Sequence, residues 1–127
     1  MKKTHCVLVA EKDPDLRDAL RHMLEAAGFS ICTAGDADAA LSALDAHEVD
    51  VLVCNLHLVE MSGYELVRGL RSEPRFAGLP IIVMAKGRDA AAAALEAGAD
   101  ETVSIPDGFD HLVGRVGRLL STGRSGR

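Results

Sequence analysis

The segment DVLVCNLHLVEMSG, residues 50–63, contains the pattern that decides the fold of this chain. Its apolar residues, Val51 to Cys54, lack the alternation of a half-exposed strand, and such a run is typical of a parallel sheet covered on both faces. The polar Asn55 follows directly, and the next loop closes on Gly63. Because the reactive groups of parallel α/β proteins gather at the carboxyl ends of central strands, Asn55 stands where functional chemistry is expected.

Strand and helix patterns alternate five times along the chain around this segment. Apolar runs predict strands at 5–10, 29–34, 49–54, 79–85 and 101–105. Helical periodicity follows each run, from about residue 63 after the third strand and at 88–97 after the fourth, and the last helix carries the apolar stripe Leu112, Val113, Val116, Leu119 and Leu120. This alternation predicts a doubly wound α/β sandwich with right-handed crossovers. Periodicity by itself leaves the strand order open.

The first two helices have recognisable end signals. Asp13 is expected to cap the first helix, with Pro14 at its first position and Gly28 beyond its last turn. The second helix is expected to open at Asp36 or Asp38, since either side chain can accept a hydrogen bond from the first turn.

Length and charge restrict the class of protein. A chain of 127 residues fits one domain with a single core, and we expect that domain at 1–120 and a tail or the start of a linker at 121–127. The net charge of −5 argues against wholesale nucleic-acid binding, which needs concentrated Lys and Arg. The basic, Gly/Ser-rich run at 115–127 is interpreted as a tail or linker, with a nucleic-acid arm as the alternative.

The sequence also favours a cytoplasmic protein without a membrane partner. No apolar run reaches the roughly 18 residues that cross a bilayer, and the apolar stretch near the N-terminus is too short for a signal peptide. Cys6, Cys32 and Cys54 have no metal-ligand or disulfide spacing, and an odd count leaves one thiol unpaired in any disulfide scheme. We interpret all three as small core residues in a reducing compartment, since no base is placed to activate Cys54 beside Asn55.

Several segments together carry a resemblance to a known family. They are VLVAEKDPDLRDALRHMLEAAGF, DVLVCNLHLVEMSGYELVRGLR, LPIIVMAKGRD and EAGADETVSIPDGFDHLVGRVGRLL. In type and spacing they resemble the successive segments of a response-regulator receiver domain (CheY-like), over about residues 5–120. The resemblance implies the flavodoxin-like strand order 2-1-3-4-5, with the active site at the carboxyl ends of strands 1, 3 and 4.

The same resemblance identifies the family positions at which this chain differs. In receivers an acidic pair binds Mg²⁺, an Asp accepts the phosphoryl group, a Thr or Ser and an aromatic residue form the switch, and a Lys precedes a Pro. The matching positions hold Glu11 and Lys12 for the acidic pair, Asn55 for the phosphoacceptor, Ala85 and Thr102 for the switch, and Ile105 with Pro106 for the Lys-Pro pair. The resemblance therefore implies a degenerate receiver, or pseudo-receiver.

The substituted residues predict what the site does not do. A neutral amide is a poor nucleophile toward phosphorus, so we expect no phosphorylation of Asn55 and no catalytic residue. Mg²⁺ prefers anionic oxygen ligands, and Lys12 presents an ammonium instead, so no metal or other cofactor is expected. We hypothesise that Lys12 is a built-in counter-ion that pairs with Glu11 or donates to the Asn55 carbonyl. Ala85 lacks the hydroxyl and Thr102 lacks the aromatic ring of the family's switch residues. Phosphate is therefore not expected to switch the domain.

Residues on the rim of the site leave alternatives open. Asp13, His57 and Lys86 are expected to flank the pocket. His57 could serve as another phosphoacceptor or, with Glu11 and Asp13, as a metal ligand, but an ordinary flanking side chain is favoured. Asp13 is more simply a helix cap than a replacement acid.

The remaining candidate feature is a protein-binding surface. Receivers commonly meet partners through the fourth helix, fifth strand and fifth helix, where small or exposed residues suggest docking at Ala91, Ala94, Gly114 and Arg118. The alternative is that Ala and Gly enrichment there reflects composition alone. The expected function is a phosphorylation-independent interaction module that binds a histidine kinase, another response regulator, a fused output domain or a second copy. The alternatives are an anion or small-molecule sensor using the emptied pocket, and a receiver with residual phosphotransfer.

Overall fold

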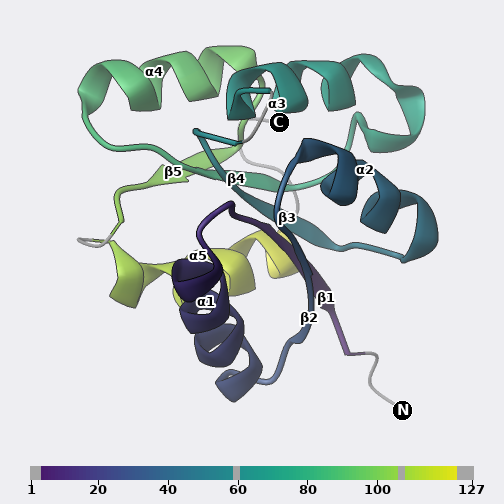
Figure 1. The fold of residues 1–127 in the computed structure, drawn as a ribbon, viewed down its shortest axis with the longest axis vertical. Helices are drawn as coiled ribbons and strands as arrows, with labels where there is room; N and C mark the ends of the chain where they lie inside the picture. The colour runs from purple at the N-terminus through teal and green to yellow at the C-terminus, as the bar shows by residue number, and fades with distance from the viewer. Residues whose placement is uncertain (1–3, 59–60, 106–107, 123–127) are drawn as a thin grey trace.

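The parallel sheet places its strands in the order that the resemblance implies. The structure is a computed structural model that describes residues 4–58, 61–105 and 108–122 (Figure 1). The strands are β1 (Cys6–Ala10), β2 (Ser30–Ala34), β3 (Val51–Asn55), β4 (Ile81–Met84) and β5 (Glu101–Val103). They pair in parallel in the order β2-β1-β3-β4-β5. The expected flavodoxin-like topology is therefore confirmed.

Helices cover both faces of the sheet. They are α1 (Pro14–Ala26), α2 (Ala37–Ala46), α3 (Gly63–Ser72), α4 (Arg88–Ala97) and α5 (Phe109–Thr122), with a short 3₁₀ helix η1 (Pro74–Phe76) after α3. Figure 1 shows α1 and α5 on one side of the sheet and α2, α3 and α4 on the other. The result is the three-layer sandwich predicted from the alternation of strands and helices.

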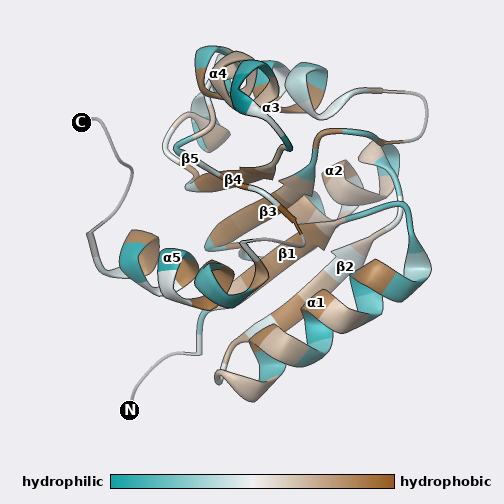
Figure 2. Ribbon diagram, turned by 90° about the vertical axis from the view of Figure 1, so that its left-hand side faces the viewer, coloured by the Kyte–Doolittle hydropathy of each residue, from teal (hydrophilic) through white to brown (hydrophobic). Residues whose placement is uncertain are grey.

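The central strands bury both of their faces, as the continuous apolar runs predict. In β1, Leu8 packs into the cluster under α2, α3 and α4, whereas Val7 and Val9 pack into the cluster under α1 and α5. All three side chains are fully buried. The strands of the sheet's centre are accordingly its most hydrophobic part in Figure 2. The edge strand β2 differs, because four of its five residues are partly or fully exposed.

Capping residues fix the first two helices at the expected positions. Asp13 caps α1 by accepting a hydrogen bond from the backbone N–H of Asp15, and Gly28 follows the helix with a φ of 101° that favours glycine. Of the two candidates for the second helix, Asp36 is the cap, and its side chain accepts from the backbone N–H of Ala39 at 2.8 Å.

The start of α3 closes tightly on the end of β3. Ser62 and Glu65 form a reciprocal capping box, in which each side chain accepts a hydrogen bond from the other residue's backbone N–H. A Cβ on Gly63 would lie 2.6 Å from the Asn55 carbonyl oxygen and 2.9 Å from the Cα of Leu56. Only glycine fits this contact without backbone displacement, so Gly63 holds the loop after Asn55 against the strand end.

Candidate functional site

Three neighbouring strands end at one edge of the sheet and bring the candidate residues together. Glu11 follows β1, Asn55 is the last residue of β3, and Ala85 follows β4. Because β3 pairs with both β1 and β4, Asn55 occupies the middle of this edge. The structure thus brings together the positions that the sequence predicts for the acidic, phosphoacceptor and switch residues.

The Glu11 carboxylate is buried and is held by neutral hydrogen-bond donors. Glu11 is only 2% exposed to solvent. The amide nitrogen of Asn55 donates to Oε1 at 2.5 Å, and the backbone N–H of Asp13 donates to Oε2 at 2.9 Å. The Arg17 guanidinium donates to the backbone carbonyl of Glu11, at 2.8 Å, rather than to its carboxylate. Each carboxylate oxygen therefore has a partner that is not a cation.

The Asn55 amide bridges Glu11 and the following loop. While its nitrogen donates to Glu11, its Oδ1 accepts a hydrogen bond from the backbone N–H of His57 at 2.9 Å. A carboxylate at position 55 could make only the second of these contacts, since an ionised carboxylate has no donor. The amide is thus the side chain that satisfies both neighbours at once, and Asn55 and Glu11 form a donor–acceptor pair, here called the Asn55–Glu11 pair.

The hypothesis that Lys12 is the counter-ion of this site is wrong. Lys12 is exposed, and across residues 4–58, 61–105 and 108–122 its ammonium makes no hydrogen bond or ion pair. The reason is that Asn55 already occupies the Glu11 oxygen that faces β3. An ammonium on a flexible chain gains more from hydration than from entering a site whose acceptors are satisfied.

The switch positions are filled by packing rather than by movable polar groups. Ala85 is buried, and its backbone N–H donates to the Val103 carbonyl at 2.9 Å. Thr102 is partly buried on β5, and Ile105 packs against the core under α1 and α5. Pro106 lies outside the described residues. An apolar side chain thus lies at the position where the family resemblance implies a lysine.

The three residues expected on the rim follow β1, β3 and β4 in the chain. Asp13, His57 and Lys86 are all exposed. Asp13 is engaged as the α1 cap, which supports its interpretation as a cap rather than a replacement acid. His57 contributes its backbone N–H to Asn55, while its own side chain is open to solvent.

Cys54 lies behind Asn55 and is a core residue. It is fully buried, and its thiol donates to the Asn55 carbonyl oxygen at 3.2 Å. Burial, with a smaller contribution from the charge of Glu11, raises the pKa of the Cys54 thiol from 9.0 to about 12. A thiol so protonated is a poor nucleophile, in agreement with a packing role.

The candidate docking residues do not all lie on the surface. Ala94 is fully buried in the core under α2, α3 and α4, so its assignment to a partner surface is wrong. The reason is that α4 turns the face that carries Ala94 and Ala97 toward the core. Ala91 is partly buried, whereas Gly114 and Arg118 are exposed on α5.

Two buried acids that the sequence did not single out organise the neighbouring elements. Glu101 of β5 is 7% exposed and forms ion pairs with Arg115, at 3.2 Å, and with Arg118, both on α5. Asp100 accepts from Arg71 of α3 at 2.8 Å and from the backbone N–H of Ile81 at 2.8 Å. Their only sequence signal is an acidic pair at the start of a strand, Asp100 before it and Glu101 as its first residue, and such a pair is equally typical of an exposed turn.

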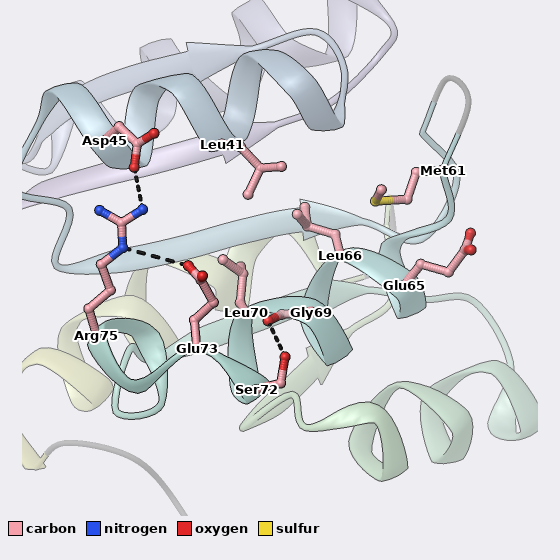
Figure 3. Close-up of a pocket in the computed structure, with 10 residues that line it drawn as sticks. All are labelled: Leu41, Asp45, Met61, Glu65, Leu66, Gly69, Leu70, Ser72, Glu73 and Arg75. Carbon is pink, nitrogen blue, oxygen red and sulfur yellow. Dashed lines mark hydrogen bonds and ion pairs between the residues drawn. The ribbon is translucent and has the colours of Figure 1, made fainter.

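A groove between α2 and α3 lies apart from the strand-end site. Its volume is about 460 Å³, and its lining residues are Leu41, Asp45, Met61, Glu65, Leu66, Gly69, Leu70, Ser72, Glu73 and Arg75 (Figure 3). Arg75 contacts Asp45 at 2.5 Å and Glu73 at 3.6 Å, so the charges at that end are already paired. Leu41 is 36% exposed and adds an apolar side chain to the lining.

The strand order and the residues at the strand ends define a class of protein. A five-stranded parallel sheet in the order 2-1-3-4-5, with an acid after β1 and polar chemistry at the end of β3, is that of a flavodoxin-like α/β domain. The chain belongs to the response regulator receiver domain family, whose model matches residues 7–117. Receiver domains of response regulators are in general signalling modules that interact with histidine kinases or other proteins, rather than enzymes.

Relatives support this assignment. The transcriptional regulatory protein KdpE of Mycobacterium tuberculosis is 36% identical over 112 residues, which are 87% of this chain and 48% of that protein. The probable transcriptional regulatory protein TcrX of the same species is 35% identical over 117 residues, 90% of this chain and 49% of the relative. The chain therefore spans about half the length of these regulators.

Solved structures show the same fold over nearly their whole length. A putative response regulator from Chloroflexus aurantiacus has a TM-score of 0.88 at 30% identity, covering 94% of this chain and 99% of that one. The receiver domain of a signal transduction histidine kinase from Syntrophus aciditrophicus has a TM-score of 0.85 at 28% identity, covering 93% and 91%. In the part of this chain that the structure describes, the helices are too short or too polar to cross a membrane.

Proposed function

We propose that this chain is a degenerate receiver: a phosphorylation-independent protein-interaction module of the two-component type. The observation that carries the proposal is the Asn55–Glu11 pair. At the position where the family resemblance implies a phosphoacceptor carboxylate, the side chain is an amide whose nitrogen donates to a buried acid at 2.5 Å. The amide nitrogen and Oδ1 of Asn55 and both oxygens of Glu11 thereby each have a hydrogen-bond partner without a phosphoryl group.

The chemistry of Asn55 supports the absence of phosphotransfer. Phosphorylation needs a nucleophilic oxygen that attacks the phosphorus atom of the donor. The donor's leaving group then departs, and an acyl phosphate remains on the protein. An amide oxygen is a much weaker nucleophile than a carboxylate, and in this protein Oδ1 also accepts the His57 N–H at 2.9 Å. Protein-bound or small phosphodonors therefore have no competent acceptor at this position.

The donor set of the site does not fit the Mg²⁺ of the family. Mg²⁺ takes hard oxygen ligands in near-octahedral geometry and relies on carboxylates. Here the available carboxylate is Glu11, and both of its oxygens already accept N–H groups, from Asn55 and from Asp13. The adjacent Lys12 adds a positive charge at the mouth of the site. We therefore propose that this domain works without the metal.

The switch residues support a domain that stays in one conformation with respect to phosphate. A ligand shifts a two-state equilibrium only through contacts that differ between the states. Ala85 has no hydroxyl to follow a phosphoryl group, and Thr102 has no ring to move behind it. The interaction surface of the proposed module is therefore permanently presented.

We place the partner surface on α4, β5 and α5. Gly114 is exposed, and a Cβ added there meets no atom within 4 Å. Arg118 is exposed while its guanidinium binds Glu101, so a charged group is held in place on this face. A histidine kinase, another response regulator, a fused output domain or a second copy of the chain would use such a surface. Gly114 and Arg118, with the partly buried Ala91, remain the residues to substitute.

The direct test is intact-mass analysis after incubation with acetyl phosphate and Mg²⁺. We expect no added phosphoryl mass on the natural chain. A matched positive control is the combined variant Lys12→Asp, Asn55→Asp, Ala85→Thr and Ile105→Lys, which restores the family residues and is expected to gain one phosphoryl group. Phosphorylation of the natural chain would overturn the proposal and favour a receiver with residual phosphotransfer.

The partner surface has its own test. Gly114→Trp is expected to weaken binding of the partner at least tenfold, because the added ring blocks close approach at a position where an added Cβ meets no atom of its own chain within 4 Å. The control is Gly69→Trp on α3, where an added Cβ also meets nothing within 4 Å. Equal binding by both variants to a partner co-purified with the full-length gene product would remove α5 from the surface.

A second candidate function, an anion or small-molecule sensor, is favoured by one observation. Lys12 and Lys86 follow β1 and β4 at the same edge of the sheet, and both are exposed. Neither has an ion-pair partner within the ranges that the structure describes. A thermal-shift screen with phosphate, sulfate and metabolite anions separates the functions, because a saturable rise in Tm that Lys12→Gln abolishes would support the sensor.

A further inference from the structure

Two cysteines that have no disulfide spacing in the sequence meet in the folded protein. Cys6 of β1 and Cys32 of β2 have their sulfur atoms 3.5 Å apart. The register pairs Cys6 with Ser30 and Leu8 with Cys32, so the thiols lie diagonally on the same face of two adjacent strands. Their contact is therefore fixed by strand pairing rather than by a flexible loop.

Cys6 and Cys32 lie nearer the surface than Cys54. Cys6 and Cys32 are partly exposed, whereas Cys54 is fully buried. Cys32 also lies on β2, the edge strand, which pairs with β1 on one side alone. A small oxidant can reach this pair from solvent, and the third cysteine is protected by the core.

We propose that Cys6 and Cys32 are a thiol–disulfide modification site, oxidised by peroxides. In the first step the Cys32 sulfur attacks one peroxide oxygen, the O–O bond breaks, and a sulfenic acid and water form. In the second step the Cys6 sulfur attacks the Cys32 sulfur, the S–O bond breaks, and the departing hydroxide takes the Cys6 proton to give water. Overall, two thiols and hydrogen peroxide give one disulfide and two water molecules.

The surroundings of Cys6 support this order of steps. Burial, the hydrogen bond and charge of Cys32, and the charge of Asp50 together raise the pKa of the Cys6 thiol from 9.0 to about 12. Cys6 is therefore a thiol at neutral pH and a poor first nucleophile toward peroxide. Its role is to attack the sulfenic acid of Cys32 and form the disulfide. In this step the closeness of the two sulfur atoms compensates in part for the small fraction of Cys6 that is ionised.

The bond needs a limited movement of the edge strand. A disulfide has an S–S length of about 2.0 Å, so the sulfurs must approach by about 1.5 Å from their separation of 3.5 Å. Side-chain rotation supplies part of this approach. Movement of the β2 backbone supplies the rest, because diagonal neighbours on adjacent strands lie about 7–8 Å apart, beyond the usual Cα separation of a disulfide. Within the described sheet β2 pairs with β1 alone, so no second strand opposes this movement.

The experiment treats the reduced full chain with hydrogen peroxide, alkylates it in denaturant and measures its intact mass. We expect loss of two hydrogen atoms, a fall in alkylated thiols from three to one, and recovery of all three on treatment with dithiothreitol. Trypsin leaves Cys32 and Cys54 on one peptide, residues 22–68, so a second digestion at Asp is needed to place the link. The expected linked peptides contain Cys6 and Cys32.

Variants make the assignment specific. Cys6→Ser and Cys32→Ser are each expected to abolish the loss of two hydrogen atoms, and Cys54→Ala to retain it. Three free thiols after peroxide treatment, a link that includes Cys54, or a disulfide between two chains would overturn the proposal. The peptide map of the natural chain decides the question even if a serine variant fails to fold. Its outcome does not depend on whether this chain accepts a phosphoryl group.

Discussion

At the scale of single residues, the Asn55–Glu11 pair makes a prediction about stability. Asn55→Asp removes the donor and places a second carboxylate beside a buried one, so we expect a loss of about 1–3 kcal/mol in the free energy of unfolding at neutral pH. Urea unfolding of the natural chain and the variant measures it. The loss should shrink in acid, because protonation of either carboxyl removes the repulsion.

A reversed pair is the matched control for that prediction. Adding Glu11→Gln to Asn55→Asp moves the amide to β1 and the carboxylate to β3, so that the amide oxygen can still accept from Asp13 and the carboxylate from His57. We expect the double variant to recover more than half of the stability lost. If the double variant is less stable than Asn55→Asp alone, the direct hydrogen bond of 2.5 Å is not the important interaction.

The buried thiol of Cys54 predicts a dependence of stability on alkaline pH. Its pKa is raised from 9.0 to about 12 in the folded protein, so the folded state holds this proton more tightly than the unfolded chain. The corresponding stability is fully present below pH 9.0 and is lost as the pH rises toward about 12. The slope for one such thiol is at most about 1.4 kcal/mol per pH unit.

The Cys54→Ala variant isolates this contribution. Denaturant unfolding of both proteins across the alkaline range should show that the natural chain loses stability faster than the variant. The difference between the two proteins should be independent of pH near neutrality, where the thiol is protonated in both states. Parallel curves throughout the alkaline range would show that Cys54 does not retain its proton on folding.

At the scale of elements, two glycines of α3 have opposite roles. Gly63→Ala would place a Cβ 2.6 Å from the Asn55 carbonyl oxygen, so we expect destabilisation by about 1–3 kcal/mol and disturbance of the strand-end site. Gly69→Ala meets no atom within 4 Å and should stabilise the helix by about 0.5–1 kcal/mol. Thermal unfolding of the two variants compares them within one helix. Stabilisation by both would mean that the loop after β3 is free to move.

At the scale of the whole molecule, we expect Mg²⁺ to leave stability unchanged. A ligand that binds the folded state raises Tm, and the natural site offers a carboxylate whose oxygens are both engaged. Thermal unfolding with millimolar Mg²⁺ should match a control at equal ionic strength. The variant that restores the family residues should instead gain Tm with Mg²⁺. A saturable rise in Tm for the natural chain would contradict the proposed function.

Much of the molecule could be predicted from sequence, for physical reasons. The apolar run at 51–54 requires a strand with both faces covered, and Asp13 and Gly28 mark the ends of the helix that follows β1. The carboxyl ends of parallel strands lie at the same edge of a sheet, so Asn55 and Glu11 were expected at one edge. Alternation, caps and strand ends are local properties, and local properties can be inferred along the chain.

The contacts between side chains could not be predicted in this way. Lys12 was expected to pair with Glu11 or to donate to the Asn55 carbonyl, but the choice of partner depends on side-chain directions across β1 and β3, and it is Asn55 that donates to Glu11. Ala94 was expected on the surface, although the packing of α4 buries it. The outcome at each position depends on which elements lie against it, and small residues give little signal in the sequence.

The sequence by itself determined the class of fold, the edge of the sheet that carries the site, and the amide at the end of the third strand, because these follow from residue type and periodicity. The tertiary structure alone decided that the amide of Asn55 satisfies Glu11, that Glu101 binds arginines of α5, and that Cys6 meets Cys32. These contacts join residues 14 to 44 positions apart. They exist only after the strands have paired and the helices have packed.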